Sequence, residues 1–320
     1  MRIYRNTPLS QCTYYRIGGN ADVLLEIVNA SDLQEAISYA GINRIEDVLP
    51  LGLGSNLLIS DKGFRGAVFR FINPQASSIE QDGSLIKAFA SVSLDDLICA
   101  LFEQEFVGLE WAGGLPSTVG GAVRGNVGAF GGDISHVFEK AEVYLLENST
   151  WVKKTCDSND MQFGYRTTSI KQQKNAIVAN AWFRLKRGSS EDLERAKKEY
   201  EDHIAYRHAH HPMEYPSCGS VFKNIVVKEE VEKILEVWPD VEKLSIQKWH
   251  NKVAMGYVLS RLGFSGFQIG GAQVSTKHAN YILNVDNAKF DDVISIIDKI
   301  KEKFSKTFGF SPELELEIVY

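Results

Sequence analysis

Long apolar runs and an excess of basic residues are both missing from this chain of 320 residues. No run of about 18 apolar residues occurs, so we expect no membrane-spanning helix. The 35 lysines and arginines stand against 41 acidic residues, and the net charge of −6 disfavours a nucleic-acid-binding protein, which usually has a basic face. The N-terminal residues contain no apolar core of the kind that a secretory signal needs. Together these absences predict a cytoplasmic protein that binds neither nucleic acid nor membrane.

Cysteine is scarce, and the four cysteines form no CxxC pair: Cys12, Cys99, Cys156 and Cys218 are far apart. Such spacing in a long chain is typical of reduced thiols in the cytoplasm. Three histidines, His208, His210 and His211, lie within four positions and suggest a metal site. No carboxylate or cysteine has a convincing spacing to them, so we expect no metal and interpret them as a surface or phosphate-facing basic strip.

Two familiar phosphate-binding signatures are also missing. No GxGxxG lies between an early strand and a helix with an acidic residue about 20 positions later, and no GxxxxGK[ST] is present. If a dinucleotide is bound, the sequence predicts that a fold other than the Rossmann fold binds it.

Strands followed by helices dominate what the chain does contain. Strands are predicted at 21–28, 47–52, 67–72, on both sides of the Asp82-Gly83 turn, and at 141–147, 177–186 and 314–320. Helices are predicted from Ser31 to Gly41, from Ser93 to Gly108, and near 191–206, 227–238, 254–262 and 288–308. This order favours an α+β fold. The length suggests two or three domains, and the highly charged helix after Gly188-Ser189-Ser190 marks the main boundary.

The first glycine-rich segment, LPLGLGSNLL, runs from Leu49 to Leu58 after a predicted strand. Gly52 and Gly54 allow backbone N–H groups to turn toward an anion, and Ser55 and Asn56 add side-chain hydrogen-bonding groups. By itself this pattern is also typical of a tight turn.

The second glycine-rich segment runs from Gly113 to Gly132. Gly120 and Gly121 are expected to begin a helix whose N-terminus faces a pyrophosphate. Leu115, Val119 and other apolar residues in the segment disfavour a flexible linker.

Several motifs, taken in order and spacing, resemble the UDP-N-acetylenolpyruvoylglucosamine reductase (MurB) family. They run from about Asn6 to Glu317: NTPLSQCTYYRIGGNA, LGLGSNLLISD, GLPSTVGGAVRGNVGAFGG, FGYRTTSI, PSCGSVFKN, GFQIGGAQVSTKHANYILN and LELEI. The short link between FGYR and the Gly219-Ser220 pair resembles the shorter subtype of this family.

The resemblance implies a domain organisation. An FAD-binding region of the vanillyl-alcohol-oxidase (PCMH) type is expected at 1–190, with subdomains at about 1–56 and 57–190 that the C-terminal strand 313–320 joins. A smaller α+β substrate-binding domain is expected at 191–312. The resemblance further implies non-covalent FAD, NADPH as hydride donor and a nucleotide-sugar substrate, and we expect a monomer.

The reaction that the resemblance implies is the reduction of UDP-N-acetylglucosamine enolpyruvate to UDP-N-acetylmuramate in peptidoglycan precursor synthesis. Hydride from reduced FAD is delivered to the vinyl carbon, and an enolate forms. The family pattern assigns enolate stabilisation to Arg166 and Glu317 and proton donation to Ser220. From the local patterns alone, Arg166 is also typical of a surface arginine, Glu317 of a solvated strand edge and Ser220 of a turn.

The resemblance also assigns binding positions. The expected cofactor-binding residues are Gly52, Gly54, Ser55, Asn56, Leu57, Gly113, Ser117, Thr118, Gly120, Gly121, Asn126, Gly128 and Ala129. The expected substrate-binding residues are Tyr165, Lys223, Asn224 and His278.

The chain departs from the family pattern at Ser117, Arg124, Ile225 and Val319, and the stretch between Asn224 and Gly270 is longer than usual. Two alternatives stay open on the sequence. One is another FAD-dependent oxidase or dehydrogenase of the same fold that acts on a sugar or lactone. The other is a non-catalytic flavin- or nucleotide-binding regulator.

Overall fold

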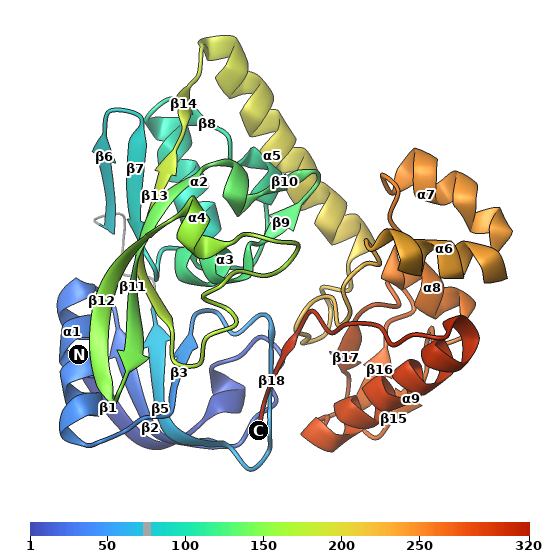
Figure 1. The fold of residues 1–320 in the computed structure, drawn as a ribbon, viewed down its shortest axis with the longest axis horizontal. Coiled ribbons are helices and arrows are strands. Elements are labelled where there is room, and N and C mark those ends of the chain that lie inside the picture. The colour runs from blue at the N-terminus through green and yellow to red at the C-terminus, as the bar shows by residue number, and fades with distance from the viewer. Residues whose placement is uncertain (73–77) are drawn as a thin grey trace. The chain divides into compact units, whose positions relative to one another are not determined.

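The computed structural model describes residues 1–72 and 78–320, and the chain passes several times between two units (Figure 1). Unit 1 consists of Met1–Thr7, Asn20–Leu53 and Phe64–Ala209. Unit 2 consists of Pro8–Gly19, Gly54–Gly63 and His210–Tyr320. Each unit has a hydrophobic core of its own.

The first sheet of unit 1 has the strand order β1-β2-β5-β3. Its strands are β1 (Arg2–Pro8), β2 (Asn20–Ile27), β5 (Phe64–Phe71) and β3 (Val48–Leu51), and the last three pair in parallel. Helix α1 (Ala30–Ile42) packs on β2. The side chain of Asn29 accepts a hydrogen bond from the Asp32 N–H at 2.9 Å and caps α1. The prediction that Ser31 begins this helix was therefore wrong by two residues, since Asn29 is an equally good cap.

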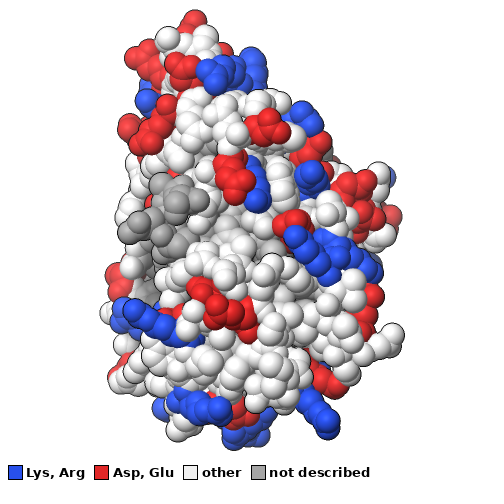
Figure 2. All heavy atoms as spheres, turned by 90° about the vertical axis from the view of Figure 1, so that its left-hand side faces the viewer, with Lys and Arg blue, Asp and Glu red and all other residues white. Residues whose placement is uncertain are grey.

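The second sheet of unit 1 is antiparallel, with the order β12-β11-β13-β7-β6. Its strands are β12 (Thr150–Asp157), β11 (Phe138–Glu147), β13 (Ile177–Arg184), β7 (Leu85–Phe89) and β6 (Ile79–Asp82). Strand β12 was not predicted, because this edge strand is mostly exposed and polar and so lacks a clear apolar alternation. Figure 2 shows the side of the molecule where β12 lies, with acidic and basic side chains interspersed over its described part.

Two further helices of unit 1 follow β7 along the chain, and one of them packs on the second sheet. Helix α2 (Leu94–Glu103) begins after Ser93, whose hydroxyl accepts from the Asp96 N–H, as predicted. It ends at Glu103, five residues before the predicted Gly108. Helix α3 (Val119–Gly125) packs on β13 and β7 and brings the second glycine-rich segment to this sheet.

The short elements of unit 1 are β8 (Phe106–Val107), η3 (Glu110–Ala112), β9 (Gly128–Ala129), β10 (Gly132–Asp133), η4 (Ile134–His136), α4 (Ser158–Met161) and β14 (Lys186–Arg187).

The charged helix α5 (Ser190–His210) belongs to unit 1 almost to its end. The Tyr200 hydroxyl donates to Asp95 at 3.0 Å, and the Nε of Arg207 donates to the Gly113 carbonyl at 2.9 Å. The Phe130 ring stacks on His203 at 3.9 Å. Because of these contacts the compact units divide after Ala209, whereas the sequence placed the boundary near residue 190.

Unit 2 contains a parallel pair, β18 (Glu317–Val319) with β4 (Leu57–Ile59), and an antiparallel sheet of β15 (Gln268–Ile269), β16 (Ala272–Val274) and β17 (Ile282–Asn284). Its helical elements are η1 (Leu9–Gln11), α6 (Lys228–Val237), η5 (Pro239–Val241), α7 (Glu242–Lys248), α8 (Met255–Arg261) and α9 (Phe290–Phe308). Helix α9 packs on the three-stranded sheet and buries the predicted stripe that includes Val293, Ile297 and Phe304.

One boundary and one helix of unit 2 differ from the prediction. The last strand covers only Glu317–Val319 of the predicted 314–320, and helix α7 was not predicted. Gly309 ends α9 with a φ of 77°, as expected of a glycine at that position. Among the described residues, no helix is long and apolar enough to cross a membrane.

Candidate active site

Arg166 lies in a closed turn of unit 1. Its backbone is left-handed, with a φ of 58°, a conformation that costs a residue with a side chain roughly 1–3 kcal/mol and is often found at functional sites. Gly164 and Thr167 exchange two backbone hydrogen bonds, of 3.0 and 3.2 Å, and close the turn around it. The guanidinium donates to the Gly128 carbonyl and lies over the Tyr165 ring, 5.4 Å from its centroid. The turn therefore brings together Arg166, Tyr165 and Gly128, three of the predicted residues.

Asn126 connects this turn to the glycine-rich segment. Its Nδ2 donates to the Gly164 carbonyl at 3.0 Å, and its Oδ1 accepts from the Ser135 N–H at 3.1 Å. The side chain is buried, and the backbone is left-handed at the end of α3. The residue predicted to bind the cofactor thus uses both polar side-chain atoms within the protein, where it anchors the Arg166 turn.

The first three backbone N–H groups of α3 donate to acceptors within the protein. The N–H of Val119 donates to the Val92 carbonyl at 2.8 Å, and that of Gly120 donates to the Ala90 carbonyl at 3.0 Å. The Gly121 N–H donates to the Thr118 hydroxyl at 3.3 Å. These groups do not support the predicted contact with a pyrophosphate, because each already has an acceptor. The Ser117 hydroxyl likewise donates to the Thr118 carbonyl at 3.1 Å.

Several predicted glycines are required by close packing. A Cβ on Gly52 would lie 2.6 Å from the Thr118 hydroxyl oxygen, and one on Gly120 would lie 2.8 Å from the Ala90 Cβ. At Gly113 it would lie 2.5 Å from the Tyr200 carbonyl oxygen. These positions exclude larger residues whether or not a cofactor is present.

Gly121 and Gly125, in contrast, are not required by close packing. They lie one turn apart on α3, so both face the same side of the helix. A Cβ on Gly121 would make only ordinary contacts at 3.4 and 3.5 Å, and one on Gly125 would meet no protein atom within 4 Å. Glycine is not required there by the chain itself. The space that a Cβ would fill fits a bound group lying against this face, and the residues therefore fit an FAD site.

In unit 2, the predicted cofactor residues Ser55–Leu57 form a backbone framework for Glu317. Leu57 pairs with Glu317 in the parallel β4–β18 ladder. The Asn56 carbonyl accepts from the Glu317 N–H at 2.9 Å, and its Nδ2 donates to the Glu315 carbonyl at 3.1 Å. Gly54 has a φ of 65°, and a Cβ there would lie 2.8 Å from the Thr13 Cα. The first glycine-rich segment is thus shared, with Gly52 in unit 1 and Gly54–Leu57 in unit 2.

Ser220 precedes a segment that pairs with the residues before Glu317. The Glu315 N–H donates to the Val221 carbonyl at 2.8 Å, and the Lys223 N–H donates to the Glu313 carbonyl at 2.9 Å. The Lys223 ammonium also forms a 2.9 Å ion pair with the exposed Glu313 carboxylate. Ser220 and Glu317 are therefore carried by adjoining backbone segments of one framework.

Two residues near Ser220, Asn224 and Cys218, have structural surroundings of their own. The Asn224 side chain accepts from the Met255 N–H at 2.9 Å and so caps the start of α8. Cys218 is buried, and burial raises the pKa of its thiol to about 12. This thiol stays protonated at neutral pH, which agrees with the absence of a recognisable nucleophile pattern around it.

His278 lies in a ring cluster with His211 and Tyr281, at centroid distances of 5.6 and 5.0 Å. Burial lowers the pKa of His278 below its ordinary value, so the ring is neutral at pH 7. Its Nδ1 accepts from the Asn280 N–H at 3.3 Å, which assigns the proton to Nε2. Within residues 1–72 and 78–320, no three histidine, cysteine, aspartate or glutamate side chains gather as a metal site.

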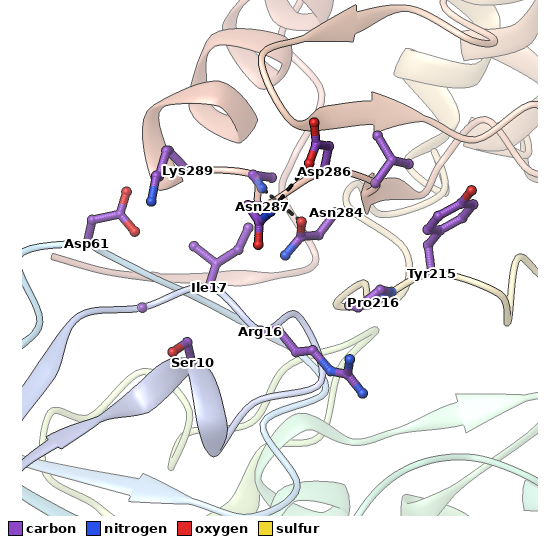
Figure 3. A pocket seen from close by; sticks show the side chains of 13 residues that line it. Ser10, Arg16, Ile17, Asp61, Tyr215, Pro216, Asn284, Asp286, Asn287 and Lys289 are labelled. Carbon is purple, nitrogen blue, oxygen red and sulfur yellow. Dashed lines mark hydrogen bonds between the residues drawn. The ribbon is translucent and has the colours of Figure 1, made fainter.

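A polar cavity of about 460 Å³ in unit 2 contains none of the predicted residues (Figure 3). Arg16, Asp61 and Lys289 contribute charges of both signs to its wall, and Asn284 and Asn287 contribute amides. This mixture does not favour a ligand of one charge. The buried Asn280 was not predicted, because its only signal in the sequence is a single amide among Ala279, Ile282 and Leu283.

The departure at Ile225 has a local explanation, whereas the hydrogen bonds made at Val319 and Arg124 use backbone carbonyls that any residue there would offer. The Ile225 N–H donates to the Val253 carbonyl at 3.0 Å, a hydrogen bond that a proline would lack. The Val319 carbonyl accepts from the Ser60 N–H at 2.7 Å. The Arg124 carbonyl accepts from the buried Thr168 hydroxyl at 2.6 Å and so fixes the segment after Arg166.

Comparison with known proteins adds independent findings. Residues 21–154 match a family model described as FAD binding domain, and residues 211–319 match one described as UDP-N-acetylenolpyruvoylglucosamine reductase, C-terminal domain.

Full-length relatives carry the same name. The UDP-N-acetylenolpyruvoylglucosamine reductase of Caldanaerobacter subterraneus is 34% identical over 99% of this chain and 94% of its own. That of Halalkalibacterium halodurans is 33% identical over 98% and 93%. The crystal structure of UDP-N-acetylenolpyruvylglucosamine reductase from Thermus caldophilus has the same fold, with a TM-score of 0.74, 24% identity and full coverage of both chains. The expected α+β fold with a PCMH-type FAD-binding domain is confirmed.

Proposed function

Because this chain belongs to the UDP-N-acetylenolpyruvoylglucosamine reductase family of oxidoreductases, we propose that it reduces UDP-N-acetylglucosamine enolpyruvate to UDP-N-acetylmuramate at the expense of NADPH. The observation that carries this proposal is the turn of Arg166. A permanently charged side chain is held in a left-handed turn that two hydrogen bonds close, on a chain segment anchored to the glycine-rich part of the FAD-binding domain.

The charge of Arg166 suits the reaction. Bound FAD, once reduced by NADPH, would supply the hydride for the vinyl carbon of the substrate. The substrate carboxylate then gains negative charge as an enolate, and a planar guanidinium stabilises such charge with two parallel hydrogen bonds. Arg166 is preorganised for this role, since its turn is closed before substrate arrives.

Ser220 is the proton donor in this proposal. A serine hydroxyl is a weak acid, but an enolate is a strong enough base to accept its proton. Glu317 steadies the enol form of the intermediate. The backbone bonds that join Val221 to Glu315, and Glu317 to Asn56, keep these two residues in a constant relation. The neutral His278, with its proton on Nε2, offers a hydrogen-bond donor to the substrate, and Lys223 offers a cation.

The cofactor is bound without a covalent link in this proposal, and the open face of α3 at Gly121 and Gly125 contributes to its site. The substrate is a nucleotide sugar, the enzyme works in the cytoplasm as a monomer, and the product enters peptidoglycan precursor synthesis. Full-length similarity to enzymes named UDP-N-acetylenolpyruvoylglucosamine reductase supports the nucleotide-sugar substrate.

A spectroscopic experiment tests the proposal. The visible spectrum of the purified protein is recorded without oxygen, first after addition of NADPH and then after addition of UDP-N-acetylglucosamine enolpyruvate. We expect NADPH to bleach the flavin absorbance and the substrate to restore it. Bleaching without recovery would favour an oxidase of the same fold that acts on a sugar or lactone. A protein that binds no flavin would favour a non-catalytic regulator.

A further inference from the structure

Asn280 is a buried amide whose two polar side-chain atoms both bind one residue of the Ser220 segment. Its side chain is almost completely buried, with 2% of the residue exposed. The Oδ1 accepts from the Phe222 N–H at 3.0 Å, and the Nδ2 donates to the Phe222 carbonyl at 2.8 Å. In addition, the Asn280 carbonyl accepts from the Val221 N–H at 2.8 Å. Three hydrogen bonds from one residue thus fix the two positions that follow Ser220.

The opposite edge of the same segment is held by the C-terminal chain. The Val221 carbonyl accepts from the Glu315 N–H, and Phe222 forms a backbone bridge with Leu314. Residues 221–223 therefore lie between Asn280 on one side and residues 313–315 on the other. Replacing Asn280 by an apolar residue would leave the N–H and carbonyl of Phe222 buried without these partners, so the segment would have to move.

The position of Ser220 depends on this arrangement. Ser220 has Gly219 before it, with a φ of 79°, and the fixed Val221 after it. Asn280 also contacts a residue that is expected to bind the substrate, because its N–H donates to the Nδ1 of His278. One residue thus joins the proposed proton donor to a histidine expected at the substrate.

We propose that Asn280 is a positioning residue that fixes the direction of the Ser220 hydroxyl during proton transfer to the substrate. This inference rests on the proposed role of Ser220. We expect loss of this positioning to lower the reaction rate and not to unfold the protein, because a displacement of about 1 Å in a reacting group is enough to slow a reaction about 100-fold.

The test compares two matched variants of the FAD-loaded enzyme. Asn280→Asp keeps the shape and the acceptor of the side chain but removes the donor to the Phe222 carbonyl. Asn284→Asp makes the same change at a second asparagine of unit 2. The Oδ1 of Asn284 accepts from the Ala288 N–H at 2.8 Å, and its Nδ2 donates to the Tyr15 carbonyl at 3.2 Å, away from the Ser220 segment. Asn280→Ser is measured as well, in case the buried carboxylate prevents folding.

The readout is the rate of each half-reaction per bound flavin in stopped-flow experiments. In both Asn280 variants we expect flavin reduction by NADPH within about twofold of the parent, and reoxidation by substrate slowed about 10- to 100-fold. The reoxidation should also show a larger isotope effect in D₂O than in the parent, because proton transfer becomes rate-limiting. Asn284→Asp should change neither rate.

Several results would overturn the inference. Equal slowing of both half-reactions, unchanged reoxidation, or loss of flavin binding in both Asn280 variants would make Asn280 a purely structural residue. Ser220→Ala is measured in parallel to separate the two proposals. If Ser220→Ala slows reoxidation and the Asn280 variants do not, only the inference about Asn280 fails. If Ser220→Ala leaves reoxidation unchanged, the assignment of the proton donor fails, and the inference about Asn280 fails with it.

Discussion

The two units hold their functional residues by different means. In unit 1, Arg166 depends on a strained turn and on side-chain contacts, among glycines that leave no room for a Cβ. In unit 2, Ser220 and Glu317 lie on segments held together by backbone hydrogen bonds, by the half-buried Asn56 and by the buried Asn280. The contrast concerns these two sites and not all of each unit, since Gly54 of unit 2 also has no room for a Cβ. We expect the surroundings of Arg166 to be sensitive to added atoms and the Ser220–Glu317 framework to lost hydrogen-bond partners, and the following predictions test this contrast.

The largest effect is expected from Ser220→Ala in unit 2. Loss of the proton donor should slow reoxidation of the flavin by substrate at least about 100-fold, since general acid catalysis typically contributes that much or more. Flavin reduction by NADPH should not change, and stopped-flow absorbance measures both steps. Ser245→Ala, which removes another hydroxyl of unit 2 that donates to the Lys252 carbonyl, is the control. Equal damage to both half-reactions by Ser220→Ala would contradict the assigned role.

The next largest effect is expected from Gly132→Ala in unit 1. The new Cβ would lie 2.3 Å from the Cγ of the buried Trp111, so ring or backbone must move. Overpacking of this kind costs about 1–3 kcal/mol of unfolding free energy, which lowers the melting temperature by several degrees. Thermal unfolding followed by circular dichroism measures it. A melting temperature equal to that of the parent would show that unit 1 tolerates added atoms.

Gly125→Ala separates packing from cofactor binding within unit 1. No protein atom lies within 4 Å of the added Cβ, and alanine favours helix over glycine by up to about 1 kcal/mol. The apoprotein should therefore be as stable as the parent or more so. If FAD lies against this face of α3, its affinity should fall about tenfold, equivalent to about 1.4 kcal/mol. Titration of the apoprotein with FAD measures the affinity, and an unchanged value would place the cofactor elsewhere.

The smallest effect concerns the pH dependence of unit 2. Burial lowers the pKa of His278, so below about pH 6.5 the unfolded chain binds a proton that the folded chain does not. This histidine therefore lowers stability as the pH falls, and it has no such effect above that range. In His278→Gln, the fall in melting temperature between about pH 7.5 and about pH 5.5 should be smaller than in the parent. A fall of the same size or larger would contradict the assignment of a buried neutral ring.

The sequence predicted best the elements whose pattern comes from burial alone. Helix α9 has a long apolar stripe and a terminal glycine, and both its existence and its end at Gly309 are confirmed. Strand β12 was missed because an exposed edge strand has no apolar periodicity. The cap of α1 was misplaced because Asn29 and Ser31 have similar capping ability, and only the three-dimensional contact decides between them.

The candidate site shows the same limit. The motifs identified the family, and the identification is confirmed, but motif glycines do not reveal why they are glycine. Gly120 is needed against Ala90, whereas Gly125 has open space, and no local pattern separates the two. The neighbours that occupy the α3 N–H groups, and the amide of Asn280, come from segments far apart in the chain. Such contacts follow from tertiary structure and have no signal in spacing.

A crystal structure of the enzyme with FAD and the enolpyruvyl substrate is the most direct test of the proposed mechanism. We expect the Arg166 guanidinium, the Ser220 hydroxyl and the Glu317 carboxylate each to lie within hydrogen-bond reach, about 2.6–3.2 Å, of the enolpyruvyl group or of a water bound to it. A complex in which any of the three side chains points away from that group, with the substrate bound in a reactive position beside the flavin, would contradict it.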